Sequence, residues 1–108
     1  IASAGREDKI RWLQEVAGID KVIHYKTQSI IQELPKQTPN GIDIYFDNVG
    51  GDHLKAAYDQ MNPFGRIVLC GMISQYNNSH PTLAMDLFPI VSKRLTLSGF
   101  ILSCILGM

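Results

Sequence analysis

The stretch Tyr45–Gly51 reads YFDNVGG and directly follows the apolar residues Ile42 and Ile44. A predicted strand therefore ends on an acid and an amide, and the chain then gives up its side chains at two successive glycines. Strands that end in this way usually do so because another group must approach the backbone closely. We expect the functional site of the chain to lie at this strand end.

Strand and helix patterns alternate along the whole chain. The predicted strands are Ile1–Ser3, Val22–Tyr25, Ile42–Phe46, Arg66–Gly71 and Leu95–Phe100. The predicted helices are Arg6–Ala17 before Gly18, Ser29–Leu34 stopped by Pro35, Asp52–Met61, and Asp86–Arg94; turns are predicted at Thr38–Gly41 and Asn62–Gly65. Strands separated by helices at this spacing indicate parallel strands with crossover helices. The sequence predicts an α/β fold with a doubly wound parallel sheet of the Rossmann type.

The length and the charge of the chain limit its possible partners. At 108 residues the chain forms one domain at most, or a piece of one. Lys and Arg together number 10, as do Asp and Glu, so the chain has no electrostatic footprint for nucleic acid. No apolar run approaches the roughly 18 residues of a membrane span. We therefore expect no nucleic-acid partner and no membrane partner.

The cysteines and histidines form no recognisable metal pattern. Cys70 and Cys104 lie far apart in the sequence, and His24, His53 and His80 are scattered singly. Zinc sites usually place such ligands at short, regular spacings, and disulfide frameworks use more cysteines in a chain of this size. The sequence predicts no metal site and reduced thiols, as in a cytoplasmic protein.

The end of the first strand is small and uncharged. Ser3-Ala4-Gly5 is followed by Arg6 and Lys9, and Tyr25 ends the next strand. In a dinucleotide-binding sheet, an acid at this position binds the 2′-hydroxyl of NAD, whereas a basic residue without the acid accommodates the 2′-phosphate of NADP. Two interpretations stay open, namely a 2′-phosphate site and a solvated first helical turn beside a half-buried tyrosine.

Two later strand ends carry polar groups. Asn48 can donate and accept hydrogen bonds at once, as a ribose contact requires. Asp47 is better placed to cap backbone N–H groups than to contact a ligand. After Cys70-Gly71 the same pattern recurs, with a polar loop that contains Tyr76. Because ligands of such sheets bind at the carboxyl ends of the strands, these residues are candidate contacts.

Five motifs resemble one enzyme family. They are SAG-x-x-x-K at 3–9, YK at 25–26, GIDIYFDNVGG at 41–51, GRIVLCGMISQYN at 65–77 and KRLTLSGF at 93–100. In this order they resemble the zinc-independent medium-chain dehydrogenase/reductases, in the group of leukotriene B4 12-hydroxydehydrogenase, prostaglandin reductase and alkenal double-bond reductase. DNVGG together with CGMISQYN is far more specific than a lone glycine motif.

The resemblance implies NADP(H) as cofactor and hydride transfer to the β-carbon of a small-molecule α,β-unsaturated ketone or aldehyde. It implies cofactor contacts from Gly5, Lys9, Tyr25, Asn48, Cys70, Tyr76, Phe100, Ile101 and Leu102. The first three would surround the 2′-phosphate, and the last three would meet the nicotinamide carboxamide. No catalytic residue is implied firmly, since Tyr76 is only a weak candidate for proton donation. A homodimer through the last strand is also implied.

The chain departs from the family in one respect. The glycine-rich phosphate turn and the strand before it do not occur in these residues, nor does the catalytic domain. We therefore expect residues 1–108 to be a partial NADP-binding Rossmann domain, lacking its first central strand and inactive alone. Two alternatives to the NADP(H)-dependent enone reductase remain, namely a non-catalytic dimerisation module and a quinone reductase of the same superfamily. A methyltransferase-type sheet usually has an acid where Ser3–Gly5 stand.

Overall fold

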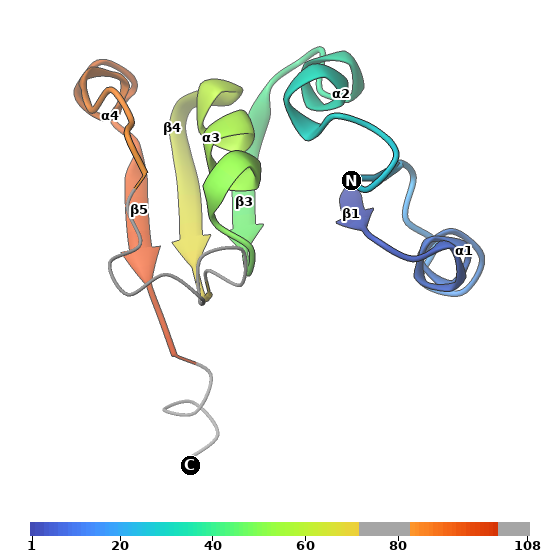
Figure 1. The fold of residues 1–108 in the computed structure, drawn as a ribbon. Helices are drawn as coiled ribbons and strands as arrows, with labels where there is room; N and C mark the ends of the chain where they lie inside the picture. The colour runs from blue at the N-terminus through green and yellow to red at the C-terminus, as the bar shows by residue number, and fades with distance from the viewer. Residues whose placement is uncertain (72–82, 102–108) are drawn as a thin grey trace. The chain divides into compact units, whose positions relative to one another are not determined.

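A computed structural model describes residues 1–71 and 83–101 of the chain. Strands and helices alternate in it (Figure 1). The elements are β1 (Ala2–Ala4), α1 (Glu7–Glu15), β2 (Val22–His24), α2 (Ile30–Gln37), β3 (Ile42–Asp47), α3 (Gly51–Asp59), β4 (Met61–Leu69), α4 (Phe88–Lys93) and β5 (Thr96–Gly99). They form two compact units, Ile1–Pro39 and Asn40–Met108, each of which is described by itself.

The first unit contains a pair of parallel strands. Ala4 of β1 is paired with His24 of β2, and α1 forms the crossover between the two strands. Ala4 and Ile23 are buried. The backbone N–H of Tyr25 donates to the carbonyl of Ala4 over 3.2 Å, so the pairing continues one residue beyond β2. This bond fixes the position of Tyr25 at the end of the first strand.

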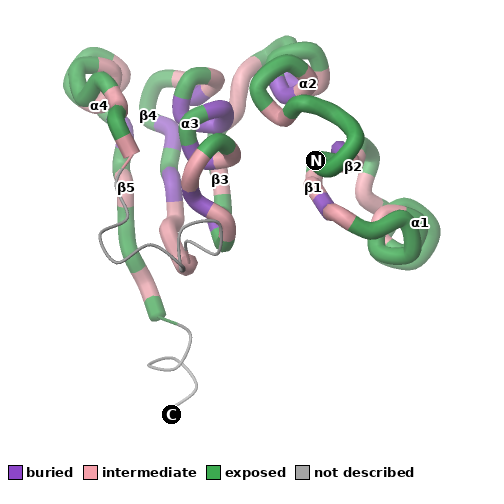
Figure 2. Tube along the Cα trace, in the orientation of Figure 1, coloured by how far each residue is buried: buried purple, intermediate pink, exposed green. Residues whose placement is uncertain are grey.

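The second unit contains a parallel sheet in the order β3-β4-β5. Its core cluster consists of Leu54, Tyr58, Met61, Ile67 and Leu95. Helix α3 supplies the first two of these residues and packs across β3 and β4, where the buried positions gather (Figure 2). Side chains alternate along a strand, and in β3 the side chains of Ile44 and Phe46 are 71% and 56% exposed, whereas Tyr45 and Asp47 are half-buried and buried. The sheet is therefore well packed on the side of α3.

The predicted α/β class, with parallel strands that alternate with helices, is confirmed. Every strand pair in the described residues is parallel, and each pair is joined by a chain segment that contains a helix. No helix within residues 1–71 and 83–101 combines the length and the apolar character that crossing a membrane requires.

The predicted end of the second helix at Pro35 is wrong. Helix α2 continues to Gln37 with Pro35 inside it. A proline removes one backbone donor from a helix, but buried Leu34 anchors this last turn. Thr38 closes the turn, because its backbone N–H and its Oγ1 donate to the Leu34 carbonyl over 2.9 and 2.7 Å.

The predicted turn at Asn62–Gly65 is wrong as well, since these residues belong to β4. Met61 was expected to end the preceding helix, but it is the first residue of β4. The pairing with β3 shifts register in this part of the strand, where Ile42 pairs with Met61 but Ile44 with Arg66. The Asn62 side chain donates to the carbonyl of Asn40 over 2.9 Å, which stabilises the irregular segment. Within strands, Pro and Gly are found mainly at edges and bulges, so this segment of β4 has the composition of a turn.

Candidate functional site

The YFDNVGG turn is organised by the carboxylate of Asp47, which is 1% exposed. Its Oδ1 accepts hydrogen bonds from the backbone N–H of Val49 over 3.0 Å and of Gly50 over 3.1 Å. The hydroxyl of Tyr45 donates to the same oxygen over 2.8 Å. Burial, together with this bond and the carboxylate charge, raises the pKa of Tyr45, so its hydroxyl remains a donor. The prediction that Asp47 caps backbone groups is confirmed.

Gly50 has a backbone conformation that only glycine adopts readily. Its φ is 72° and its ψ is −157°, a region of the Ramachandran map that excludes residues with a Cβ. Gly50 is the N-cap of α3, so this conformation turns the chain from the end of β3 into the helix. The turn leaves Asn48 exposed at the carboxyl edge of the sheet.

The ends of the three strands are tied together by backbone hydrogen bonds. The N–H of Cys70 donates to the Asp47 carbonyl over 2.8 Å, and the N–H of Phe100 donates to the Leu69 carbonyl over 2.9 Å. Asn48, Cys70 and Phe100 therefore lie at one edge of the second unit's sheet. Ile101 follows Phe100 and is 63% exposed.

The pKa of the Cys70 thiol is shifted in the direction that favours the neutral form. Burial, followed by the charge of Asp47, raises the pKa of the thiol. Because the thiolate and not the thiol is the nucleophile, Cys70 provides a small, neutral side chain at the strand end.

Burial also lowers the pKa of His53, against the opposing effects of Asp47 and Asp52, so this ring is neutral near pH 7.

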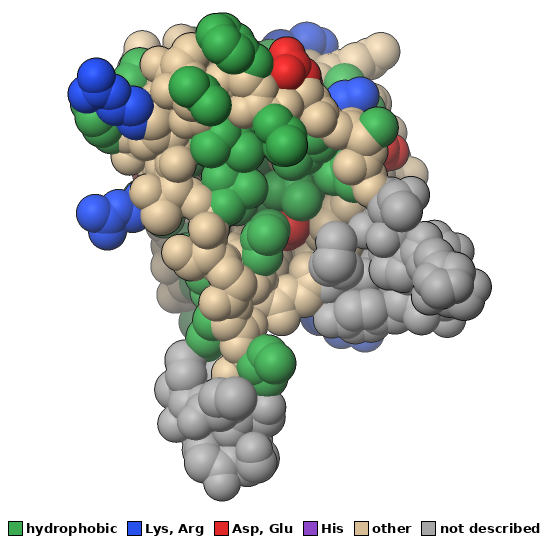
Figure 3. Space-filling model, turned by 90° about the vertical axis from the view of Figure 1, so that its left-hand side faces the viewer, with side chains coloured by type: hydrophobic (Ala, Val, Ile, Leu, Met, Phe, Trp, Pro, Cys, Tyr) green, Lys and Arg blue, Asp and Glu red, His purple; other side chains and the backbone are tan. Residues whose placement is uncertain are grey.

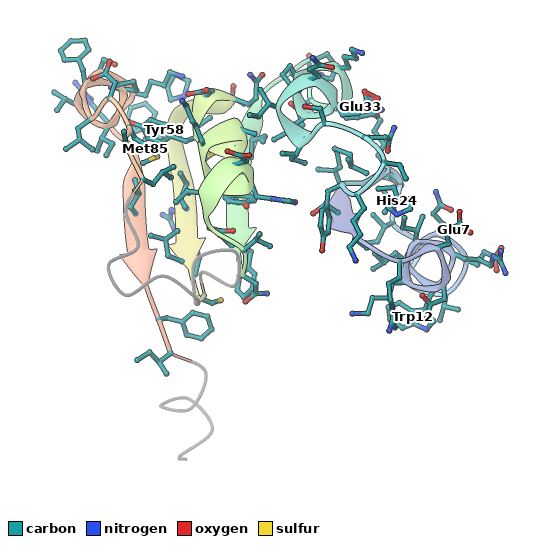
Figure 4. The ribbon with its side chains drawn as sticks, viewed as in Figure 1. Glu7, Trp12, His24, Glu33, Tyr58 and Met85 are labelled. Carbon is teal, nitrogen blue, oxygen red and sulfur yellow. The ribbon has the colours of Figure 1, made fainter. Side chains whose placement is uncertain are left out.

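Gly5 and Tyr25 lie in direct contact in the first unit. A Cβ atom at Gly5 would lie 2.7 Å from the hydroxyl oxygen of Tyr25 and 2.9 Å from its Cζ. Real Cβ atoms do not approach so closely, so the tyrosine can lie over this position because residue 5 is a glycine. The ring of His24, labelled in Figure 4, places Nε2 3.3 Å from the Gly5 carbonyl oxygen. The end of β1 is thus enclosed by residues of β2 and its continuation.

Lys9 lies in α1 and lines a hollow of about 500 Å³. The other lining residues are Ser3, Ala4, Asp8, Trp12 and Leu13. The hollow combines a cation with the indole of Trp12, which Figure 4 shows on α1. Its size falls within the range of about 300–1,000 Å³ that is usual for small-molecule sites. Arg6, by contrast, is paired with Asp8 over 3.2 Å.

The structure thus places the predicted site residues in two groups, one in each unit, and within the first group it shows a contact between Gly5 and Tyr25. Gly5, Tyr25 and Lys9 belong to the first unit, whereas the second group forms the strand edge described above. Tyr76 and Leu102 lie outside the described residues. Sequence reasoning did not select Trp12, because this residue lies outside all five motifs.

The sequence also matches known proteins over most of its length. A family profile described as zinc-binding dehydrogenase matches residues 1–105. This chain belongs to the zinc-binding dehydrogenase family. Within the family, it is 41% identical to 2-alkenal reductase (NADP(+)-dependent) of Nicotiana tabacum over 94% of the chain and 30% of that protein. It is 42% identical to prostaglandin reductase 1 of Bos taurus, over 94% of the chain and 31% of that protein.

A solved structure of a related protein shows that the similarity extends to the fold. CurA of Vibrio vulnificus in complex with NADPH aligns with a TM-score of 0.80 and 38% identity, over 92% of this chain and 31% of CurA. The resemblance to the prostaglandin and alkenal reductase group is confirmed. The chain spans about 30% of the length of these relatives. Within residues 1–71 and 83–101, no group of three His, Cys, Asp or Glu side chains could hold a metal ion.

Proposed function

We propose that this chain is the NADP(H)-binding part of a reductase that transfers hydride from NADPH to the C=C bond of α,β-unsaturated ketones and aldehydes. The observation that carries the proposal is the contact at the end of β1, where the Tyr25 hydroxyl lies over Gly5. The names of two relatives support it, since one is an NADP(+)-dependent 2-alkenal reductase and the other was solved with NADPH.

The residues at the end of β1 fit a 2′-phosphate. A phosphate needs hydroxyl or amide donors and positive charge. Because Gly5 has no side chain, the Tyr25 hydroxyl can lie over it as a donor, and Lys9 contributes an ammonium group. The acid Asp8 lines the same hollow as Lys9, and the guanidinium of Arg6 pairs with Asp8 over 3.2 Å. The group therefore favours a phosphate over the bare ribose hydroxyl of NAD.

The remaining contacts are proposed for the second group. Bound NADP(H) would supply hydride at its nicotinamide ring. The Asn48 amide can donate to and accept from a ribose, and the neutral thiol of Cys70 leaves room at the neighbouring strand end. The backbone groups of Phe100 and Ile101 follow β5 and would hold the carboxamide. Tyr76 and Leu102 are included in this proposal on the family resemblance alone, Tyr76 chiefly as a contact that anchors the cofactor.

The activity is proposed for the full-length protein and not for the chain alone. The chain spans about 30% of its relatives, and its described sheets are β1-β2 and β3-β4-β5. We propose that both belong to one doubly wound sheet whose central strand, with the glycine-rich turn that holds the pyrophosphate, is not among residues 1–108. Without that turn, the cofactor would be held at one end only.

We further propose a homodimer through β5. In the described residues β5 pairs with β4 alone and forms the edge of its sheet. An unpaired edge strand is a ready template for pairing with another chain. Apolar side chains gather on the face that β5 and α4 present (Figure 3). The side chains of Leu87, Phe88 and Val91 are 63%, 68% and 71% exposed.

An activity assay of the full-length protein tests the proposal. With a small 2-alkenal, we expect NADPH to be oxidised and the saturated aldehyde to form, at a kcat/KM at least about ten-fold above that with NADH, since the charged contacts act on one cofactor only. Oxidation that requires a quinone in place of the alkenal would favour the quinone reductase alternative. A stable dimer that oxidises NADPH neither with the alkenal nor with the quinone would favour the non-catalytic dimerisation module.

The same assay tests the metal prediction. After dialysis against a strong chelator the rate is expected to be unchanged, because hydride transfer from NADPH needs only orientation of the nicotinamide and stabilisation of charge on the carbonyl oxygen. A lost rate that returns on addition of zinc would contradict this expectation.

A further inference from the structure

We propose that Lys26 is a second cation of the 2′-phosphate site and strengthens the preference for a 2′-phosphorylated nucleotide. The proposal rests on the proposed NADP(H)-binding function. Lys26 directly follows Tyr25, and its Cε lies 3.0 Å from the position that a Cβ of Gly5 would occupy. The Tyr25 hydroxyl oxygen lies 2.7 Å from the same point. Both side chains therefore end over Gly5, with the Lys26 ammonium bonded to the Cε atom that lies there.

Lys26 forms no ion pair within the part of the chain that the structure describes. Ion pairs there join Arg6 to Asp8 over 3.2 Å and Lys36 to Glu33 over 3.6 Å, and neither involves Lys26. Lys26 is exposed, so an incoming anion can reach its ammonium group. A cation that has no carboxylate partner retains its full charge for a ligand.

The chemistry of a phosphate monoester calls for a second cation. A phosphate group carries about −1.5 to −2 charges near pH 7, and one lysine offsets only part of this. Lys26 adds a compact charge with three donors, beside the hydroxyl of Tyr25. A ribose hydroxyl carries no such charge, so Lys26 is expected to discriminate between the two nucleotides and not to strengthen binding in general.

Calorimetric titration of the full-length protein tests the role of Lys26. The probes are adenosine 2′,5′-bisphosphate and adenosine 5′-monophosphate, which differ only in the 2′-phosphate. Lys26→Gln is expected to raise the Kd of the bisphosphate about three- to ten-fold, as the loss of a charge-assisted contact would, and to leave the Kd of the monophosphate unchanged. Lys26→Arg, which keeps the charge, is expected to retain most of the affinity. Lys36→Gln is the matched control and is expected to change neither constant.

The outcomes separate this inference from the function on which it rests. If Lys9→Ala weakens the bisphosphate but Lys26→Gln does not, the role of Lys26 is overturned and the proposed function stands. If the wild-type protein binds both probes equally, the 2′-phosphate site fails together with Lys26. An equal loss for both probes in Lys26→Gln would show a general effect on the site and would also overturn the inference.

Discussion

Replacing Asp47 with alanine is expected to lower the free energy of unfolding by about 3 kcal/mol or more. The Asp47 carboxylate accepts from the backbone N–H groups of Val49 and Gly50 and from the hydroxyl of Tyr45. In the alanine variant all three donors lose their acceptor in or near a buried position. Each buried donor left without a partner costs about 1–3 kcal/mol. Asp47 is also 1% exposed, so water cannot easily take the place of the carboxylate.

Urea unfolding followed by circular dichroism measures this loss, and Asp47→Asn is the control. Asparagine keeps one acceptor oxygen and nearly the same shape, so its cost is expected to be about 1–2 kcal/mol. An alanine variant that is already unfolded without urea would agree with the expectation. Wild-type stability of Asp47→Ala would contradict the assignment of the carboxylate as the organiser of the turn.

Replacing Lys9 with alanine in the full-length protein is expected to raise the Michaelis constant for NADPH about ten-fold or more, while the constant for NADH stays nearly the same. A charge-assisted contact contributes about 1.5–3 kcal/mol, and about 1.4 kcal/mol corresponds to a ten-fold change in affinity. Only NADPH carries the 2′-phosphate that the Lys9 ammonium would contact. Steady-state kinetics with each cofactor at saturating enone measure the two constants.

Lys36→Ala is the matched control for this variant, since Lys36 is an exposed lysine of the same unit that is paired with Glu33. It is expected to change neither constant. Equal losses with NADPH and NADH in Lys9→Ala would show that the lysine supports the fold or the common part of the cofactor, and the assignment to the 2′-phosphate would be wrong.

Much of the fold could be predicted, because the spacing of apolar residues indicates strands and helices and the glycines indicate where they end. The apolar alternation before Asp47 and the glycine pair after it predict both β3 and the start of α3. The end of α2 beyond Pro35 and the strand structure of Asn62–Gly65 could not be predicted, because hydrogen bonds of particular side chains override the local preference there. Thr38 closes α2 after the proline, and the bonds of the Asn62 side chain hold a bulge where the composition indicates a turn.

The sequence indicates candidate site residues only where they follow a predicted strand end, as Lys9 and Tyr25 do. Their role stays a proposal. The contact of Tyr25 with Gly5 depends on the pairing of β1 with β2, and so does the position of Lys26. A lysine after a strand resembles any solvated residue until the neighbouring strand end is known.

A crystal structure of the full-length protein with bound NADPH tests the central claim most directly. The account predicts the 2′-phosphate at the end of β1, with its oxygens within about 3 Å of donors on Lys9 and Tyr25, beside the backbone of Gly5. A 2′-phosphate that lies in solvent or on another part of the protein, with these residues turned away from it, would contradict the account.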